Sequence, residues 1–313
     1  MFTELIYPLL FFLVAVVAGN NLSACTGSII SSRIVSKRFG IWTAILGYIL
    51  GFLIEGGMLK AGLIALMPVH TTTLVIIALL VSLTVFVVAH WIRVPMSLSM
   101  TLAMTVVGIE LAYSGFLNLQ FLSYIIIFWV LSTVLSVAFA WVTMRASYRF
   151  LTNSRIWPTL KGIKVLLIIL SFFAAFVLGA NTIGFLFAAT SDMLNPVYGT
   201  ITVVAAIIIG SILLSKGELR RIGNEILPLR YLNALITQMV SVLVVQAATM
   251  MSIPSSNTQT FTASLYGAGL SYKTRIILKK PMFTIILSWI ATATISLAVG
   301  YAATYSIFHL LLP

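Results

Sequence analysis

Long runs of apolar residues, separated by short polar segments, dominate the pattern along this chain. A membrane span needs about 20 mostly apolar residues, and ten segments approach that length. They cover residues 5–30, 40–59, 70–91, 95–115, 120–145, 163–190, 196–214, 230–251, 255–270 and 282–311. Several contain Gly or Pro and the ninth is short, which leaves open that one or two are re-entrant hairpins. The pattern predicts an all-α, polytopic membrane protein of about ten spans.

Composition supports a membrane protein. Of 313 residues, 61% are hydrophobic and only 8% are charged, whereas a soluble domain has about 25% charged residues. A chain so poor in charge cannot cover a globular surface in water, which excludes soluble and disordered proteins. The single cysteine, Cys25, excludes an intramolecular disulfide and a cysteine-based metal site.

The net charge of +12 has a topological meaning, because the basic residues cluster between the apolar runs. Of the 18 Lys and Arg residues, all but Lys60 fall in the odd-numbered loops between the ten spans. Cytoplasmic loops carry the excess of Lys and Arg. We therefore expect cytoplasmic odd loops and both termini outside a plasma membrane, with the first apolar run as a span rather than a cleaved signal peptide.

The chain contains an internal repeat with an offset of 159 to 161 residues. The sequence Ala18–Asn21 (AGNN) corresponds to Gly179–Thr182 (GANT), and Pro95 with Ser97 corresponds to Pro254 with Ser256. Gly51 and Gly210 match at the same spacing, as do Gly108 and Gly267.

The longest polar stretch, residues 145–162, lies between the two copies. We predict two repeats, 1–150 and 151–313, joined by this cytoplasmic linker. Each copy holds about five spans, and an odd number inverts the second copy relative to the first. Inverted repeats are typical of secondary transporters.

Polar residues inside membrane spans are costly and mark functional sites by default. The polar segments 19–27 and 179–184 combine Gly with amides and hydroxyls, which predicts broken helices whose free N–H groups bind an anion. The alternative is a close helix crossing at small residues with Asn bridging the helices. Occurrence at equivalent positions of the repeat favours a site. The candidates are Asn20, Asn21, Ser23, Asn181 and Thr182.

A second pair of motifs places hydroxyls directly after proline. Proline is favoured in the first turn of a helix, so the following hydroxyl and N–H groups become donors at that N-terminus. The alternative is ordinary helix capping, which is harder to exclude in the first copy than in the more polar second copy. These motifs add the candidate anion ligands Ser97, Ser99, Ser256, Asn257 and Thr258.

Two carboxylates fall inside the predicted spans. We expect Glu55 to bind a coupling cation or carry a proton, the alternative being a structural acid paired with Lys60. Glu110 takes the position of Gly269 in the other repeat, and we expect it to be structural. The nucleotide-binding, metalloprotease and serine-hydrolase motifs are absent, so we expect neither an enzyme nor a cofactor.

The paired motifs resemble the inorganic phosphate transporter family, which includes phosphate permeases and some sulfate permeases. That family carries G-A-N-D-x-A-N-x-x-G and then P-V-S-T-T-H once per half. The corresponding segments here are Ala18–Gly27 and Gly179–Ala188, then Pro95–Met100 and Pro254–Gln259. The segment Arg221–Leu229 also looks like the family's sequence before its second Pro-Ser motif. The resemblance covers nearly the whole chain and respects the repeat.

The chain departs from the family where each half of the family has an aspartate that is implicated in cation coupling and anion binding. Asn21 and Thr182 stand at those two positions. Their oxygens can coordinate Na⁺ more weakly than a carboxylate, and neither side chain can exchange a proton near pH 7. The resemblance therefore predicts a cation-coupling set of Asn21, Thr182 and Glu55, with Na⁺ or H⁺ as the coupling ion.

The lost aspartates also affect the expected substrate. Phosphate keeps a proton at neutral pH and needs an acceptor for it, which the carbonyl of Asn21 or Asn181 could supply, whereas sulfate needs only donors. We predict a secondary active transporter that works by alternating access on an inorganic oxyanion, with phosphate first because of the family. Sulfate is the alternative, and a passive anion channel is the more distant one. The family further implies a homodimer.

Overall fold

The computed structural model describes residues 3–68, 71–91, 97–151, 156–214, 231–271 and 279–311, and every regular element within these ranges is a helix. The α-helices are α1 (Ile6–Ser31), α2 (Lys37–Glu55), α3 (Lys60–Leu66), α4 (Thr72–Trp91), α5 (Leu98–Tyr113), α6 (Leu119–Leu151), α7 (Ile156–Leu178), α8 (Gly184–Ala188), α9 (Pro196–Leu213), α12 (Tyr231–Met250), α13 (Asn257–Leu270) and α14 (Lys279–Tyr305). Short helical turns are η1 (Thr3–Leu5) and η2 (Gly56–Leu59), and π-helical segments are η3 (Gly179–Ile183) and η4 (Ser306–Leu311). The all-helical prediction is confirmed.

Eight helical stretches in the described ranges are long and apolar enough to cross a membrane. They are Thr3–Ser31, Lys37–Leu66, Thr72–Ala89, Leu119–Ser147, Leu160–Ala188, Pro196–Leu213, Tyr231–Met250 and Ile286–Phe308. The other two predicted spans correspond to α5 and α13, with 16 and 14 residues. At about 1.5 Å per residue both are shorter than the bilayer core of about 30 Å.

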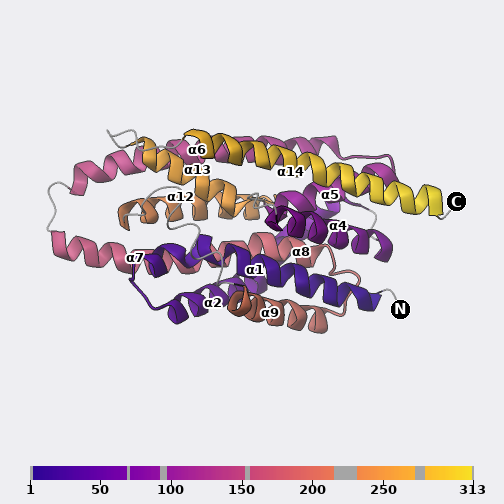
Figure 1. Cartoon of the computed structure of the whole chain (residues 1–313), viewed down its shortest axis with the longest axis horizontal. Coiled ribbons are helices and arrows are strands. Elements are labelled where there is room, and N and C mark those ends of the chain that lie inside the picture. Colours follow the sequence, from indigo (N-terminus) through magenta and orange to yellow (C-terminus); the bar gives the residue numbers. More distant parts are fainter. Residues whose placement is uncertain are drawn as a thin grey trace.

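The short helices occupy opposite halves of the elongated bundle (Figure 1). Helices α4 and α5 lie in the half nearer the two chain ends, and α12 and α13 lie in the half nearer the α6–α7 connection. Both chain ends lie at the same end of the molecule. The two short helices therefore lie on opposite sides of the middle of the bundle.

One close helix crossing occurs twice. In the first copy the glycine belongs to the first half of the chain and its partner to the second half, and in the second copy these roles are reversed. A side chain at Gly51 of α2 would overlap the carbonyl oxygen of Phe176 in α7, and one at Gly210 of α9 would overlap the carbonyl oxygen of Ala15 in α1. Gly51 and Gly210 are 159 residues apart, and Ala15 and Phe176 are 161 apart. Glycine permits such approach of two backbones inside a membrane.

A second pair of crossings shows the same reversal of the two halves. Gly108 of α5 packs on the backbone of Leu297 in α14, and Gly267 of α13 packs on the backbone of Val137 in α6. These partners are also separated by 159 and 160 residues. Each short helix is thus held by the long helix that follows the other short helix.

The predicted break in the first span is wrong, because α1 continues from Ile6 to Ser31 without interruption. Two of its polar side chains bond to carbonyls of the preceding turn, so the backbone need not unwind to satisfy them. The amide of Asn21 donates to the Val17 carbonyl at 3.1 Å, and the Thr26 hydroxyl donates to the Leu22 carbonyl at 3.1 Å. Gly19 packs against Gly210 and Leu214 of α9, which is the close crossing named as the alternative.

In the second half the corresponding segment is distorted rather than broken. Residues Gly179–Ile183 form a π-helix between α7 and α8, which widens the helix without opening a free end. A side chain at Gly179 would overlap the Tyr48 backbone of α2. Single π-helical turns inside α-helices are frequent at functional sites.

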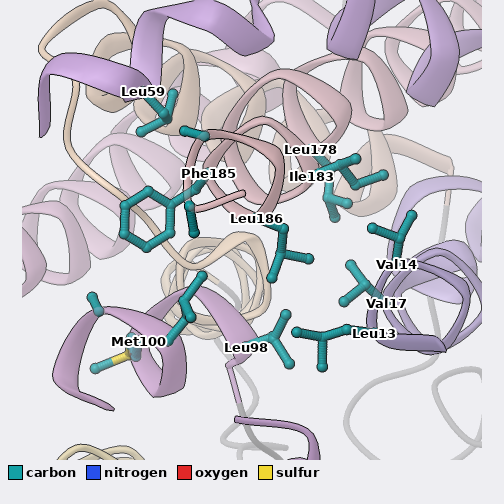
Figure 2. Packing of buried hydrophobic residues seen from close by; sticks show 14 of the residues in the cluster. Leu13, Val14, Val17, Leu59, Leu98, Met100, Leu178, Ile183, Phe185 and Leu186 are labelled. Carbon is teal, nitrogen blue, oxygen red and sulfur yellow. The ribbon is translucent and has the colours of Figure 1, made fainter. Parts of the chain in front are cut away.

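A buried apolar cluster brings α1, α5 and α8 together beside this π-helix. Figure 2 shows Leu13 and Val17 of α1 directed toward Leu98 of α5 and Leu186 of α8. All four side chains are buried. The packing fixes the start of α5 against the segment around η3.

Candidate functional site

The site is built around the N-termini of α5 and α13, each of which has a serine N-cap. Ser97 Oγ accepts a hydrogen bond from the Met100 N–H, and Ser256 Oγ accepts one from the Gln259 N–H at 3.1 Å. Both hydroxyls thus fulfil the capping role named as the alternative for these motifs. Helix N-termini carry a partial positive charge and favour anions. Pro95 and Arg221–Leu229 lie outside the described residues.

Both N-termini reach the π-helical segment η3. The hydroxyls of Ser99 in α5 and Thr182 in η3 are 2.9 Å apart. The N–H of Ser255, just before α13, donates to Asn181 Oδ1 at 2.8 Å. Helices from the two halves of the chain therefore converge on two neighbouring residues.

A matching contact joins the other pair of motifs. Thr258 Oγ1 of α13 donates to Asn21 Oδ1 of α1 at 3.4 Å. Asn21 and Thr182 are 161 residues apart, and Ser99 and Thr258 are 159 apart. Each residue that stands at a family aspartate position thus contacts the Pro-Ser helix of the other half.

Asn181 holds the turn between α12 and α13. Its Oδ1 accepts from the Ser255 N–H, and its Nδ2 donates to Thr249 Oγ1 and to the Ile253 carbonyl, both at 3.0 Å. The side chain is fully buried. Its polar atoms are engaged within the protein, so the structure gives Asn181 a positioning role beside the candidate ligands.

Three buried polar atoms in the predicted motifs have no hydrogen-bond partner among the described residues. They are Ser23 Oγ of α1, Ser255 Oγ and Asn257 Nδ2. Buried polar groups are normally paired, and all three can donate to an anion. Ser255 was not among the predicted ligands, although its place in the polar run 255–259 was a signal for it.

A second layer of hydrogen bonds orients this region. Ser241 of α12 donates to Asn257 Oδ1 at 2.9 Å, which leaves the Asn257 amide nitrogen as the free group. Trp129 Nε1 of α6 donates to the Pro254 carbonyl at 2.8 Å, and Gln259 donates to Thr133 at 2.7 Å. Sequence reasoning missed these supporting residues. Trp289, 160 residues after Trp129, was the available signal for the indole contact.

Asn20 precedes Asn21 on α1 and is half-buried. Glu55, at the end of α2, accepts a hydrogen bond from Gln246 of α12 at 2.7 Å. The expected alternative partner, Lys60, instead pairs with Asp192 at 2.6 Å. Glu55 precedes Gly56, which packs against Gly184 next to η3, so this carboxylate lies close to the site in the fold.

The hydrogen bonds at the centre of the site join neutral groups. In the described part of the chain, no cluster of three His, Cys, Asp or Glu residues could hold a metal ion. Neutral donors with two helix N-termini suit reversible binding of an anion. In a protein whose described residues include eight helices long and apolar enough to cross a membrane, this arrangement is typical of a membrane transport protein.

Comparison with known proteins agrees with this class. The model of the phosphate transporter family matches residues 17–300, and the chain belongs to that family. It is a multi-pass membrane transporter, as expected, and not an enzyme.

Two relatives match over most of their length. A protein named as a phosphate permease of Methanocaldococcus jannaschii is 26% identical over 93% of this chain and 93% of its own. The sulfate permease CysP of Bacillus subtilis is 25% identical over 89% of this chain and 82% of its own.

A solved structure described as the sodium-dependent phosphate transporter matches with a TM-score of 0.85. The match covers 99% of this chain and 100% of that chain, at 15% sequence identity. It confirms the fold.

Proposed function

We propose that this protein is a secondary active permease for a tetrahedral inorganic oxyanion, phosphate or sulfate, coupled to Na⁺ or H⁺. The observation that carries the proposal is the exchanged pair of contacts, Ser99 with Thr182 and Thr258 with Asn21. They gather the N-termini of two short helices from opposite halves of the bundle at one place. Inverted-repeat transporters bind substrate at the interface of the repeats near the middle of the membrane.

The anion is held by neutral donors. Ser23 Oγ, Ser255 Oγ and Asn257 Nδ2 are buried and unpaired in the described structure, and the dipoles of α5 and α13 add partial positive charge. A hydrogen bond to a charged group contributes about 1.5–3 kcal/mol. Three such bonds bind an oxyanion without a fixed countercharge, so the anion can still be released.

Alternating access exposes the site to each side of the membrane in turn by rocking of helix groups. Because the close crossings join each repeat, 1–150 or 151–313, to the other, the helices that move together come from both repeats. The glycine crossings support this, because Gly51 on Phe176 and Gly210 on Ala15 are the same contact with the halves exchanged. The contacts of Ser99 and Thr258 have the same relationship. In such a mechanism we expect the Ser99–Thr182 contact to separate when the site opens to one side of the membrane, and the Thr258–Asn21 contact to separate when it opens to the other.

Phosphate is the substrate that the family's name indicates, and a specific observation favours sulfate as the second candidate. Phosphate needs an acceptor for its proton. Asn181 Oδ1 already accepts from Ser255, and Asn21 Oδ1 accepts from Thr258. Of the free atoms, Asn257 Nδ2 can only donate, and the hydroxyls of Ser23 and Ser255 can donate as well as accept. All three can donate to a fully deprotonated anion.

The coupling cation has two candidate locations. Asn21 and Thr182 offer side-chain oxygens at the site, and Glu55 offers a carboxylate near η3. Asn and Thr oxygens suit Na⁺, whereas a carboxylate can also take up a proton.

Uptake into proteoliposomes tests the function. Labelled phosphate and labelled sulfate are supplied separately, each with no gradient, an inward Na⁺ gradient or an inward proton gradient. We expect uphill accumulation of one anion under one of these gradients. Equilibration without accumulation would indicate a passive channel, and absence of any protein-dependent flux would contradict the proposal.

A further inference from the structure

Glu110 is the one charged side chain that is buried in the described part of the chain. It is 2% exposed and lies in the last turn of α5. Ser114 Oγ donates to its Oε1 at 2.7 Å, and its Oε2 has no hydrogen-bond partner among the described residues. This side chain is used neither by the anion site nor by the packing of α5 on α14, which occurs at Gly108.

A carboxylate in such a place needs a positive ligand, because an isolated charge away from water is costly. Helices α14, α4 and α3 pack against α5. The titratable residues with described side chains on them are Tyr301 and Tyr305 of α14, and Lys60 of α3, which pairs with Asp192. Tyr113 is the other such residue on α5. None of these donates to Glu110.

The available ligand is a proton. A metal ion requires several oxygen ligands, whereas only the Ser114 hydroxyl bonds to the Glu110 carboxyl. The free Oε2 is a single acceptor position, which matches one proton.

Glu110 is connected to the anion site by the helix that carries both. Ser99, Ala103, Val106 and Glu110 are spaced by four, three and four residues, which places them on one face of α5. Ser99 contacts Thr182, and eleven residues of helix span about 16 Å. Ala103 and Val106 between them are buried and apolar, so any coupling passes through movement of α5 as a whole.

The interface of α5 with α14 contains further unpaired polar atoms. Thr105 Oγ1 of α5 and Thr304 Oγ1 of α14 are buried without a partner in the described structure. The two helices are in close contact at Gly108 and Gly300. Buried polar groups that the protein leaves unpaired are commonly served by water, which would carry protons to and from Glu110.

We propose that Glu110 is the proton-binding group that couples anion transport to a proton gradient, an inference that rests on the proposed oxyanion permease. A proton from water forms an O–H bond at Oε2 when the site faces one side. That bond breaks after the protein reorients, and the proton returns to water on the other side. The change in charge alters the packing of α5, whose first turn contacts the anion site. The other repeat has Gly269 at the equivalent position, which cannot bind a proton, so only the first repeat carries this coupling group.

The test compares variants of the full-length protein in proteoliposomes, with labelled sulfate and labelled phosphate as probes. Glu110→Gln keeps the shape and the Ser114 acceptor but cannot exchange a proton. We expect its accumulation ratio under a proton gradient to fall to about 1, and its gradient-free exchange to lose the pH dependence of the wild type. Glu110→Asp should recover part of the accumulation. Glu4→Gln, which changes an exposed carboxylate of η1, is the matched control and should behave as wild type.

Each other outcome overturns the inference. If Glu110→Gln still accumulates anion normally under a proton gradient, Glu110 is not the coupling group. If accumulation is lost in Glu55→Gln and kept in Glu110→Gln, the coupling group is Glu55. Equal loss of exchange and accumulation in both Glu110 variants would show a structural role. A wild type that accumulates anion only with Na⁺ would refute proton coupling but keep the proposed function, whereas a wild type without any anion flux would refute the function itself.

Discussion

Asn181 Oδ1 accepts a hydrogen bond of 2.8 Å from the backbone N–H of Ser255, across 74 residues of sequence. This bond ties the π-helical segment η3 to the turn that precedes α13. The Asn181 amide nitrogen completes the attachment through Thr249 and Ile253. The turn between α12 and α13 is thus positioned by one fully buried amide rather than by apolar packing alone.

Replacement of Asn181 by Ala should therefore destabilise the protein and stop transport. Three hydrogen bonds are lost, and at about 1 kcal/mol net for each the free energy of unfolding should fall by about 3 kcal/mol. The measurement is the midpoint of thermal unfolding in detergent, together with anion uptake. Asn118→Ala, which removes one part-buried hydrogen bond from the Phe121 N–H, is the control. Equal effects of both substitutions would show that the Asn181 amide does not hold the turn.

Ser255→Ala should weaken anion binding with little effect on folding. Ser255 Oγ is buried without a partner in the described structure, so its removal breaks no internal hydrogen bond. If it donates to the anion, the loss of about 1.5–3 kcal/mol should raise KM for uptake at least about tenfold. Ser211→Ala removes an equally buried, unpaired hydroxyl of α9 and should leave KM unchanged. An unchanged KM in Ser255→Ala would remove this residue from the site.

Gly51→Ala should be strongly destabilising, because its added methyl group would overlap the backbone of Phe176, which cannot rotate away. Overpacking of this kind costs about 1–3 kcal/mol. Gly210→Ala should have the same effect against Ala15, since the crossing is the equivalent one. Gly57→Ala is the control, because nothing lies within 4 Å of its added methyl group. Thermal unfolding of the four proteins measures the difference, and tolerance of Gly51→Ala would show that α2 and α7 are not fixed at this crossing.

Sequence periodicity predicted the fold well where it depends on long apolar runs. Eight of the ten predicted spans correspond to helices long enough to cross a membrane. The motifs chosen from sequence also contact one another in the structure, Ser99 with Thr182 and Thr258 with Asn21, although the sequence did not indicate which residues would pair.

The local backbone could not be read in the same way. Asn and Gly at residues 19–21 indicated a broken helix, but the Asn21 amide bonds to Val17 within an intact α1. Whether a polar side chain unwinds a helix or bonds back to it depends on what packs against it. Nor could the sequence show that both polar atoms of the Asn181 side chain are hydrogen-bonded while the Ser255 hydroxyl has no partner among the described residues. These contacts depend on the shape of the turn at 251–256 and not on residue type.

Cysteine labelling tests the predicted orientation of the chain. Gln120 and Arg145 are exposed and lie near opposite ends of α6, about 38 Å apart at the rise of an α-helix. Helix α6 begins toward the end of the bundle that holds both chain ends and runs to the α6–α7 connection (Figure 1), and Gln120 is its second residue. The native Cys25 is buried, so wild-type protein should give little background. With a membrane-impermeant maleimide, Gln120→Cys should react in intact cells, and Arg145→Cys should react only after permeabilisation, because the excess of Lys and Arg predicts that the basic loops are cytoplasmic. The reverse result would place both chain ends inside and contradict the orientation drawn from the 18 basic residues.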